Sequence, residues 1–217
     1  MNKGYYFINY EQKNKKRGQT MVIMDIKVDN LYAFKNFHIN MSYPKKIVDS
    51  TIEMEYLESR PNFRYKKVNI IMGGNATGKT SLGKLIMLFA NYFRDGSYER
   101  FTDKVDDKQK SAMLQVDFLT NVDVLYRFIM NIGSKSNSEY TENDVDIKIY
   151  ATCINKKDNY EICAKRLDEK KDVQVSYGEI NTQGWHFSYP EDASKNKTYI
   201  TIEDDSRYIY ILKQILQ

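Results

Sequence analysis

The sequence predicts an α/β fold in which one long helix packs against a mixed, largely antiparallel β-sheet. A glycine-rich stretch at 73–80 separates a mostly apolar run at 68–72 from an amphipathic run that continues to Phe93. Segments rich in alternating, β-branched or aromatic residues lie on both sides of this unit, which is typical of strands. The 217 residues are enough for one domain with a sizeable core, and 41% apolar with 29% charged residues indicates a globular chain.

Before the glycine-rich stretch, the chain divides into an extension and a β-rich segment. Residues 1–20 combine aromatic side chains with the basic run Lys13–Arg17, so we interpret them as a basic and aromatic N-terminal extension. From Val22, apolar and polar residues alternate, which is strand periodicity, and the main domain is expected to span 21–217. Strands are predicted here over 22–28, 38–43, 52–57 and 63–72.

After the glycine-rich stretch, helical spacing predicts a helix, and Asp95-Gly96 is its predicted end. The unit formed by the apolar run, the loop and this helix is therefore assigned to 68–95, and a β lobe to 113–203. Strands are predicted within the β lobe over 113–119, 122–129, 145–154, 160–167, 173–177 and 185–189. A turn at 155–159 is expected to join the third and fourth of these in a hairpin.

A last helix is predicted at 206–217, with Asp204, Asp205 and Ser206 as its capping residues. Its apolar stripe reaches the final residue, Gln217, without a C-cap. We expect that this stripe packs back on the lobe or that the natural element continues beyond the chain.

The glycine-rich stretch fits the phosphate-binding pattern G-x-x-x-x-G-K-[ST] at every fixed position. Its residues are Gly73, Gly74, Asn75, Ala76, Thr77, Gly78, Lys79 and Thr80. Glycines allow backbone N–H groups to approach a phosphate closely, and the following helix N-terminus adds positive potential. Lys79 is the expected ligand of the β- and γ-phosphates and the one catalytic residue we assign, and the Thr80 hydroxyl is an expected Mg²⁺ ligand. The alternative is a glycine-rich turn that carries a surface lysine.

Three features together resemble the ABC-type ATPase superfamily, in the branch of SMC, RecN and OLD-type proteins that includes many bacterial anti-phage ATPases. They are the opening strand, the segment Tyr32–Phe37, and the glycine-rich loop with Asn75 in third position. The resemblance covers about 21–93 and is only architectural beyond them. It implies a P-loop NTPase lobe, the N-terminal lobe of an ABC-type head.

The resemblance also implies ligands for ATP and Mg²⁺. The triphosphate site would extend from Gly73 through Ser81, and Lys35 with Asn36 would lie near the base or ribose. Gln115 would sense Mg²⁺ and the γ-phosphate, because it lies on the next predicted strand; the alternative is an ordinary strand position.

Two motifs of a complete ABC-type head have only faint echoes, Val175–Glu179 for the signature and Tyr199–Asp205 for the acidic motif. The head is therefore expected to be incomplete, with Walker A only. We expect Mg-ATP binding in a protein of DNA repair or anti-phage defence, completed by a C-terminal lobe, a partner chain or a homodimer. A DNA or nuclease effector is the implied further partner, and little or no ATPase activity is expected from this chain alone.

Two other functions stay open. One is a small P-loop kinase, which would need a complete acidic motif and an arginine-rich lid. The other is a non-catalytic module in which nucleotide gates an interaction or the basic extension contacts nucleic acid.

Charge, hydropathy and cysteine content bear on the expected partners and compartment. Thirty-three basic and 29 acidic residues give a net charge of +4, which by itself does not indicate nucleic acid binding. No apolar run approaches the ~20 residues of a membrane span, so no membrane partner is expected. Cys153 and Cys163 lack metal-type spacing, and with ATP binding they indicate free thiols in a cytoplasmic protein.

Overall fold

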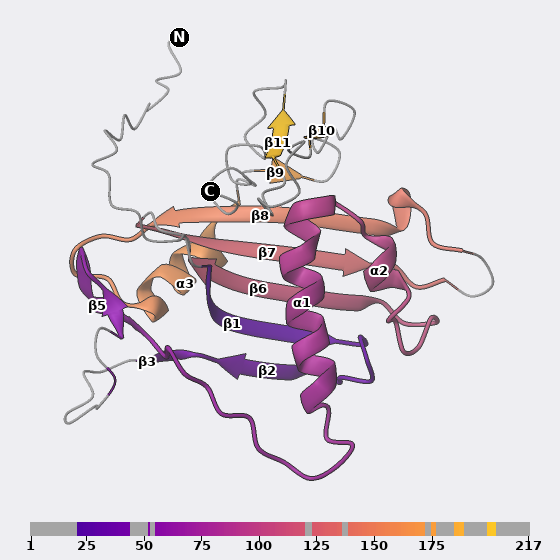
Figure 1. Ribbon diagram of the computed structural model, residues 1–217, viewed down its shortest axis with the longest axis horizontal. Helices are drawn as coiled ribbons and strands as arrows, with labels where there is room; N and C mark the ends of the chain where they lie inside the picture. Colours follow the sequence, from indigo (N-terminus) through magenta and orange to yellow (C-terminus); the bar gives the residue numbers. More distant parts are fainter. Residues whose placement is uncertain are drawn as a thin grey trace.

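The chain folds as a mixed α/β protein around an antiparallel sheet. The computed structural model describes residues 21–43, 52, 55–119, 123–135 and 139–171, with only the backbone at 94–95 and in strands at 175–176, 185–188 and 199–202. The main sheet has six strands in the order β2-β1-β6-β7-β8-β9, and every neighbouring pair is antiparallel (Figure 1). These strands are β1 (Val22–Asp29), β2 (Phe37–Asn40), β6 (Ala112–Leu119), β7 (Val124–Ile132), β8 (Val145–Cys153) and β9 (Val175–Ser176).

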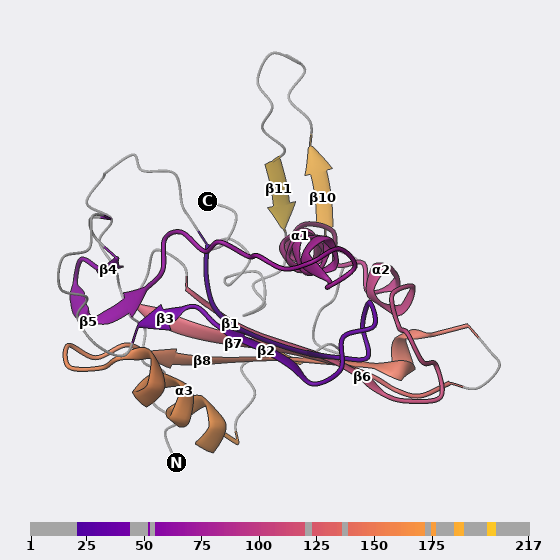
Figure 2. The ribbon, with the colours of Figure 1, turned by 90° about the horizontal axis from the view of Figure 1, so that it is seen from below.

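The two longer helices, α1 (Lys79–Asp95) and α3 (Tyr160–Glu169), lie on opposite faces of the main sheet, and the other elements are short (Figure 2). The shorter helical elements are α2 (Glu99–Thr102) and the 3₁₀ turn η1 (Glu142–Asp144). A three-stranded sheet has the order β3-β5-β4, and β10 pairs with β11. These strands are β3 (Ser42–Tyr43), β4 (Tyr56–Leu57), β5 (Arg60–Tyr65), β10 (Trp185–Ser188) and β11 (Tyr199–Ile202).

Strand alternation gives the main sheet two different faces. The face under α1 is apolar, and the face toward α3, which we call the polar face, combines polar side chains with a smaller apolar cluster. On β6, Leu114 and Val116 contact the underside of α1, so Gln115 and Asp117 face the other way. The apolar face is filled by aromatic rings, because Phe89 of α1 meets Phe118 and Phe128 at centroid distances of 5.5 and 5.4 Å. Such edge-on packing in a fully buried layer holds α1 firmly on the sheet.

Helix α1 has the predicted position and end. It begins after Gly78 and ends at Gly96, whose left-handed backbone (φ 67°) lets its N–H donate to the Tyr92 carbonyl. Because this C-cap needs a positive φ, glycine is the natural residue there. The predicted helix is confirmed.

The predicted strand at 160–167 is wrong, because these residues form α3. The Asn159 side chain accepts a hydrogen bond from the Ile162 N–H at 2.9 Å and caps the helix. Tyr160, Cys163 and Leu167 are buried at helical spacing in the smaller apolar cluster on the polar face of the sheet, so no hairpin pairs Cys153 with Cys163. Both cysteines are free thiols, as expected.

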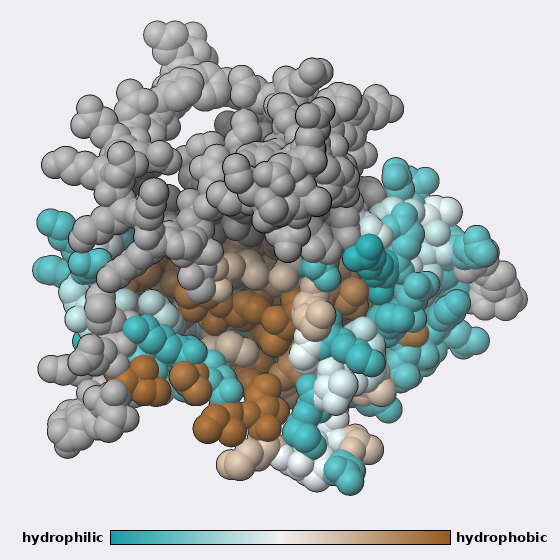
Figure 3. All heavy atoms as spheres, viewed as in Figure 1, coloured by the Kyte–Doolittle hydropathy of each residue, from teal (hydrophilic) through white to brown (hydrophobic). Residues whose placement is uncertain are grey.

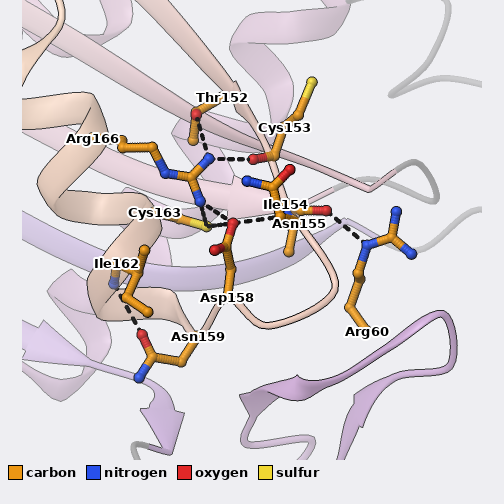
Figure 4. Close-up of polar contacts among 10 residues, drawn as sticks. All are labelled: Arg60, Thr152, Cys153, Ile154, Asn155, Asp158, Asn159, Ile162, Cys163 and Arg166. Atoms are coloured by element: carbon orange, nitrogen blue, oxygen red, sulfur yellow. Dashed lines mark hydrogen bonds and ion pairs between the residues drawn. The ribbon is translucent and has the colours of Figure 1, made fainter.

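The loop that enters α3 is held by polar contacts from three elements (Figure 4). Asp158 accepts a hydrogen bond from the Asn155 N–H at 2.7 Å and forms an ion pair with Arg166 of α3. Arg60 of β5 donates to the Ile154 carbonyl at 2.7 Å, so the same loop also joins the small sheet to the main one. Burial raises the pKa of the Cys163 thiol to about 12, which keeps this thiol protonated at neutral pH.

The structure confirms most expected strands and divides others. The predicted strand 38–43 is two strands in different sheets, and the predicted strand 63–72 ends at Tyr65, so residues 68–72 belong to no strand. The expected extension at 1–20 and the expected final helix at 206–217 lie outside the described residues. Within the part of the chain that is described, no helix is long and apolar enough to cross a membrane.

Candidate functional site

The glycine-rich loop leads directly into the N-terminus of α1. No side chain caps this terminus, no acidic residue lies in its first turn, and the first intrahelical bond comes from the Leu82 N–H to the Gly78 carbonyl at 2.9 Å. The N–H groups before Leu82 therefore have no helical acceptor, and the helix dipole adds to their positive potential. An anion could bind here through backbone groups.

Two glycines of the loop have a direct structural reason. Gly78 has a φ of 89°, and a Cβ built on it would lie 3.1 Å from Cε1 of Phe34. A Cβ on Gly73 would lie 2.8 Å from Oγ1 of Thr77, closer than real Cβ atoms come to other atoms. The loop is therefore compact at both ends, and side chains at these two positions would open it.

Lys79 folds its side chain back over the loop. Its ammonium donates to the Gly73 carbonyl at 2.7 Å and to the Gly74 carbonyl, and lies 3.3 Å from Thr77 Oγ1. Thr77 in turn donates to the Gly74 carbonyl at 2.9 Å. The cation thus lies over the loop on neutral acceptors, and a phosphate oxygen could replace these carbonyls as its partner.

The remaining residues of the motif are accessible. Asn75 and Thr80 are exposed, as is Ala76, which has a left-handed backbone with a φ of 60°, and Ser81 is half-buried in the first turn of α1. Serine and threonine hydroxyls at such a position can bind Mg²⁺ together with phosphate oxygens. Among the described residues, no group of three His, Cys, Asp or Glu side chains could hold a metal by itself.

The segment before β2 packs against the loop through Phe34. Its ring lies beside Gly78, on the side where a Cβ would project, and its centroid is 4.9 Å from that of the Phe37 ring. Four non-glycine residues between β1 and β2 have left-handed backbones: Asn30 (φ 55°), Tyr32 (φ 52°), Ala33 (φ 65°) and Asn36 (φ 46°). The Asn36 N–H donates to Asp29 Oδ1 at 2.8 Å, which fixes one of these unusual conformations. Strained backbone of this kind is concentrated at functional sites.

Lys35 and Asn36 are exposed on this turn, so the structure places them in the segment that touches the loop. Lys35 also lies near Asp107, whose pKa is lowered first by its hydrogen bond from Lys110 and, to a smaller extent, by the charge of Lys35.

The structure does not bring Gln115 to the loop. Its neighbours on β6 point toward α1, so its own side chain lies on the opposite face of the sheet from that helix. Its buried amide nitrogen has no hydrogen-bond partner among the described residues. The expected role in binding Mg²⁺ with Thr80 has no geometric support in this arrangement.

The polar face of the sheet carries a buried network that the sequence did not reveal. Arg127 binds Asp117 through two hydrogen bonds of 2.7 and 2.8 Å, and the Tyr160 hydroxyl donates to the same carboxylate at 2.8 Å. Burial lowers the pKa of Arg127, but its bonds and charge interactions with Asp117 and Asp168 outweigh this and raise it. Burial, followed by the charge of Asp117, raises the pKa of Tyr160. The network attaches α3 to the sheet.

The two echoes of missing motifs are only partly described. Val175–Ser176 and Tyr199–Ile202 are strands β9 and β11, and the rest of both echoes lies outside the described residues. Comparison with family models, with curated proteins and with solved structures finds no match to this chain.

Proposed function

We propose that this chain binds Mg-ATP at residues 73–81 as the N-terminal, P-loop-bearing lobe of an ABC-type ATPase head. The observation that carries this proposal is the loop itself. Its Lys79 side chain lies over the loop, next to an uncapped helix N-terminus, and a Cβ at Gly73 or Gly78 would crowd the loop. Backbone N–H groups would hold the phosphates, and Lys79 would pair with the negative charge that develops on transfer. Thr80 and the phosphate oxygens would hold Mg²⁺, which neutralises phosphate charge.

The segment before the loop supports the idea of a second lobe. Val68, Ile70, Ile71 and Met72 are 57%, 80%, 43% and 86% exposed, and apolar side chains gather in the centre and lower part of this side of the molecule (Figure 3). Among the described residues, no backbone group of 68–72 has a hydrogen-bond partner. Large apolar side chains on both sides of an unpaired chain are typical of a strand buried on both faces of a sheet. We propose that a further lobe or a partner chain supplies such a sheet.

ATP would then be shared between this lobe and a second head, with the residue that activates water supplied from outside this chain. Hydrolysis by the chain alone is therefore expected to be slow. DNA repair or anti-phage defence is the biological setting that the resemblance suggests for such a head.

The test is titration of the chain with a fluorescent ATP analogue, with and without Mg²⁺. Lys79→Ala should abolish binding, whereas Lys84→Ala, an exposed lysine five positions along the same helix, should leave it unchanged. Thr80→Ala should remove most of the dependence on Mg²⁺. Binding that survives Lys79→Ala would contradict the proposed site. A robust steady-state ATPase rate that Lys79→Ala abolishes would contradict the need for another lobe.

A further inference from the structure

The small sheet has one inner and one outer face, and only the inner one is apolar. Phe63 of β5 is fully buried and meets the Tyr160 ring edge-on at a centroid distance of 6.5 Å. Arg64 follows it, so its side chain lies on the outer face. The strand register places Tyr43 and Tyr56 directly beside Arg64, one on each neighbouring strand.

Four residues make up this outer surface, which we call the basic–aromatic face: Tyr43, Tyr56, Arg64 and Lys66. The Arg64 guanidinium carbon lies 5.6 Å from the centroid of the Tyr56 ring. The Lys66 ammonium lies 5.3 Å from the centroid of the Tyr43 ring. Cations and rings therefore alternate across the three strands, which are spaced about 5 Å apart.

The cations of this face have rings as partners and, within the described part of the chain, no carboxylate. A guanidinium or ammonium over a ring keeps its N–H donors, which can bind phosphate. The Arg64 plane can also stack on a nucleobase, as a planar guanidinium does on aromatic surfaces. This differs from Arg60 of the same strand, whose charge is paired with Asp123 at 2.9 Å.

We propose that the basic–aromatic face binds single-stranded nucleic acid. Phosphates would pair with Arg64 and Lys66, and unstacked bases would lie on the tyrosine rings and the guanidinium plane. A duplex keeps its bases stacked, so it would contact only Arg64 and Lys66 of this face. We therefore expect the tyrosine rings to make single-strand binding tighter than duplex binding. The proposal is independent of nucleotide binding at 73–81. Because β5 continues directly into 66–72, a bound nucleic acid would contact the chain just before the glycine-rich loop.

The test is fluorescence anisotropy of the full chain with labelled single strands of about 16 nucleotides, one DNA and one RNA, and with a hairpin duplex. Arg64→Gln and Lys66→Gln should each weaken single-strand binding about 5-fold or more. Each should also reduce the slope of log affinity against log salt by about 0.7, the value for one phosphate contact. Tyr43→Leu should weaken binding about 5-fold or more and leave the salt slope unchanged.

The matched control is Lys165→Gln, which removes one exposed charge from the outer side of α3, where the side chain is 79% exposed. It should bind like the unmodified chain, and thermal melting should show that every variant is folded. Relative affinity for the two single strands reports which nucleic acid is preferred. The proposal fails if Arg64→Gln and Lys66→Gln bind like the control. It also fails if the duplex binds as tightly as the single strands and Tyr43→Leu has no effect.

Discussion

Gly78 is the position in the candidate site where the backbone conformation and the space available most strongly favour glycine, and Gly78→Ala tests this requirement. Its φ of 89° costs a residue with a Cβ about 1–2 kcal/mol. The added Cβ would also lie 3.1 Å from the Phe34 ring, a contact that forces the ring to move. Together we expect a loss of about 2–3 kcal/mol in the free energy of unfolding. This corresponds to a fall in Tm of roughly 4–12 °C for a chain of this size.

Gly83→Ala is the matched control, because it makes the same chemical change five residues further along. Gly83 lies within α1, and a Cβ there would meet nothing within 4 Å. Alanine in an exposed helical position should stabilise the chain by about 0.5–1 kcal/mol. The two substitutions are therefore expected to have opposite signs.

Urea unfolding of both variants in the unmodified and Phe34→Ala backgrounds separates backbone strain from the ring contact. If the ring matters, Gly78→Ala should cost about 1–2 kcal/mol in the Phe34→Ala background, which is the backbone term alone. Equal stability of Gly78→Ala and Gly83→Ala would refute the left-handed conformation. An unchanged cost in the Phe34→Ala background would refute the contact.

Three further predictions concern the rest of the fold. Asp117→Asn should destabilise the chain by about 3–5 kcal/mol in urea unfolding, because it leaves Arg127 buried without its main partner. Asp168→Asn should cost less than about 1 kcal/mol, because the Asp168 side chain is 63% exposed. Similar losses for the two variants would contradict the buried pair. Asn159→Ala should lower the free energy of unfolding by about 1 kcal/mol, because the α3 cap is lost. Asn159→Ser should lower it by less, because serine can still cap the helix. The opposite order would argue against capping. The pKa of Asp144 is lowered to about 2, first by its bond from Lys135 and then by Thr141. The contacts of this carboxylate should therefore support η1 above about pH 4 and be lost as pH falls toward 2. A protection factor of the Thr141 amide against hydrogen exchange that stays constant in that window would contradict the assignment.

The sequence predicted α1 and the position of the loop before it, because the evidence for both is local. A 3.6-residue apolar period, a terminal glycine and a contiguous phosphate-binding pattern depend on neighbouring residues only. The strand predicted at 160–167 failed because its tyrosine, isoleucine and cysteine suit a strand, while a single hydrogen bond to Asn159 and burial against the sheet favour a helix. Local propensity is a weak guide where capping and tertiary packing decide.

Contacts across the sheet could not be predicted for the same reason. The pairing of Asp117 with Arg127 requires the β6–β7 register, and Tyr160 reaches them only because α3 lies on that face. The face on which Gln115 lies follows from strand parity, which the sequence pattern alone fixes only once the core side is known. Within the candidate site, the contact of Phe34 with Gly78 joins segments more than 40 residues apart, so only the left-handed turn before β2 brings it about.

The failure at 68–72 has a different origin, and it bears on function. The apolar run predicts a strand, and the described residues offer it no neighbour, so its side chains remain exposed. An apolar pattern is typical of a segment that is buried in the native state. An apolar strand is stable only when both its edges and both its faces are covered. In the proposed head, the second lobe would cover this run. The same reasoning connects the exposed run to the loop that follows it: a sheet that formed around 68–72 would fix the start of the loop, and with it the carbonyls of Gly73 and Gly74 that now hold Lys79. Completion of the sheet and release of Lys79 toward phosphate would then be linked through one short stretch of backbone.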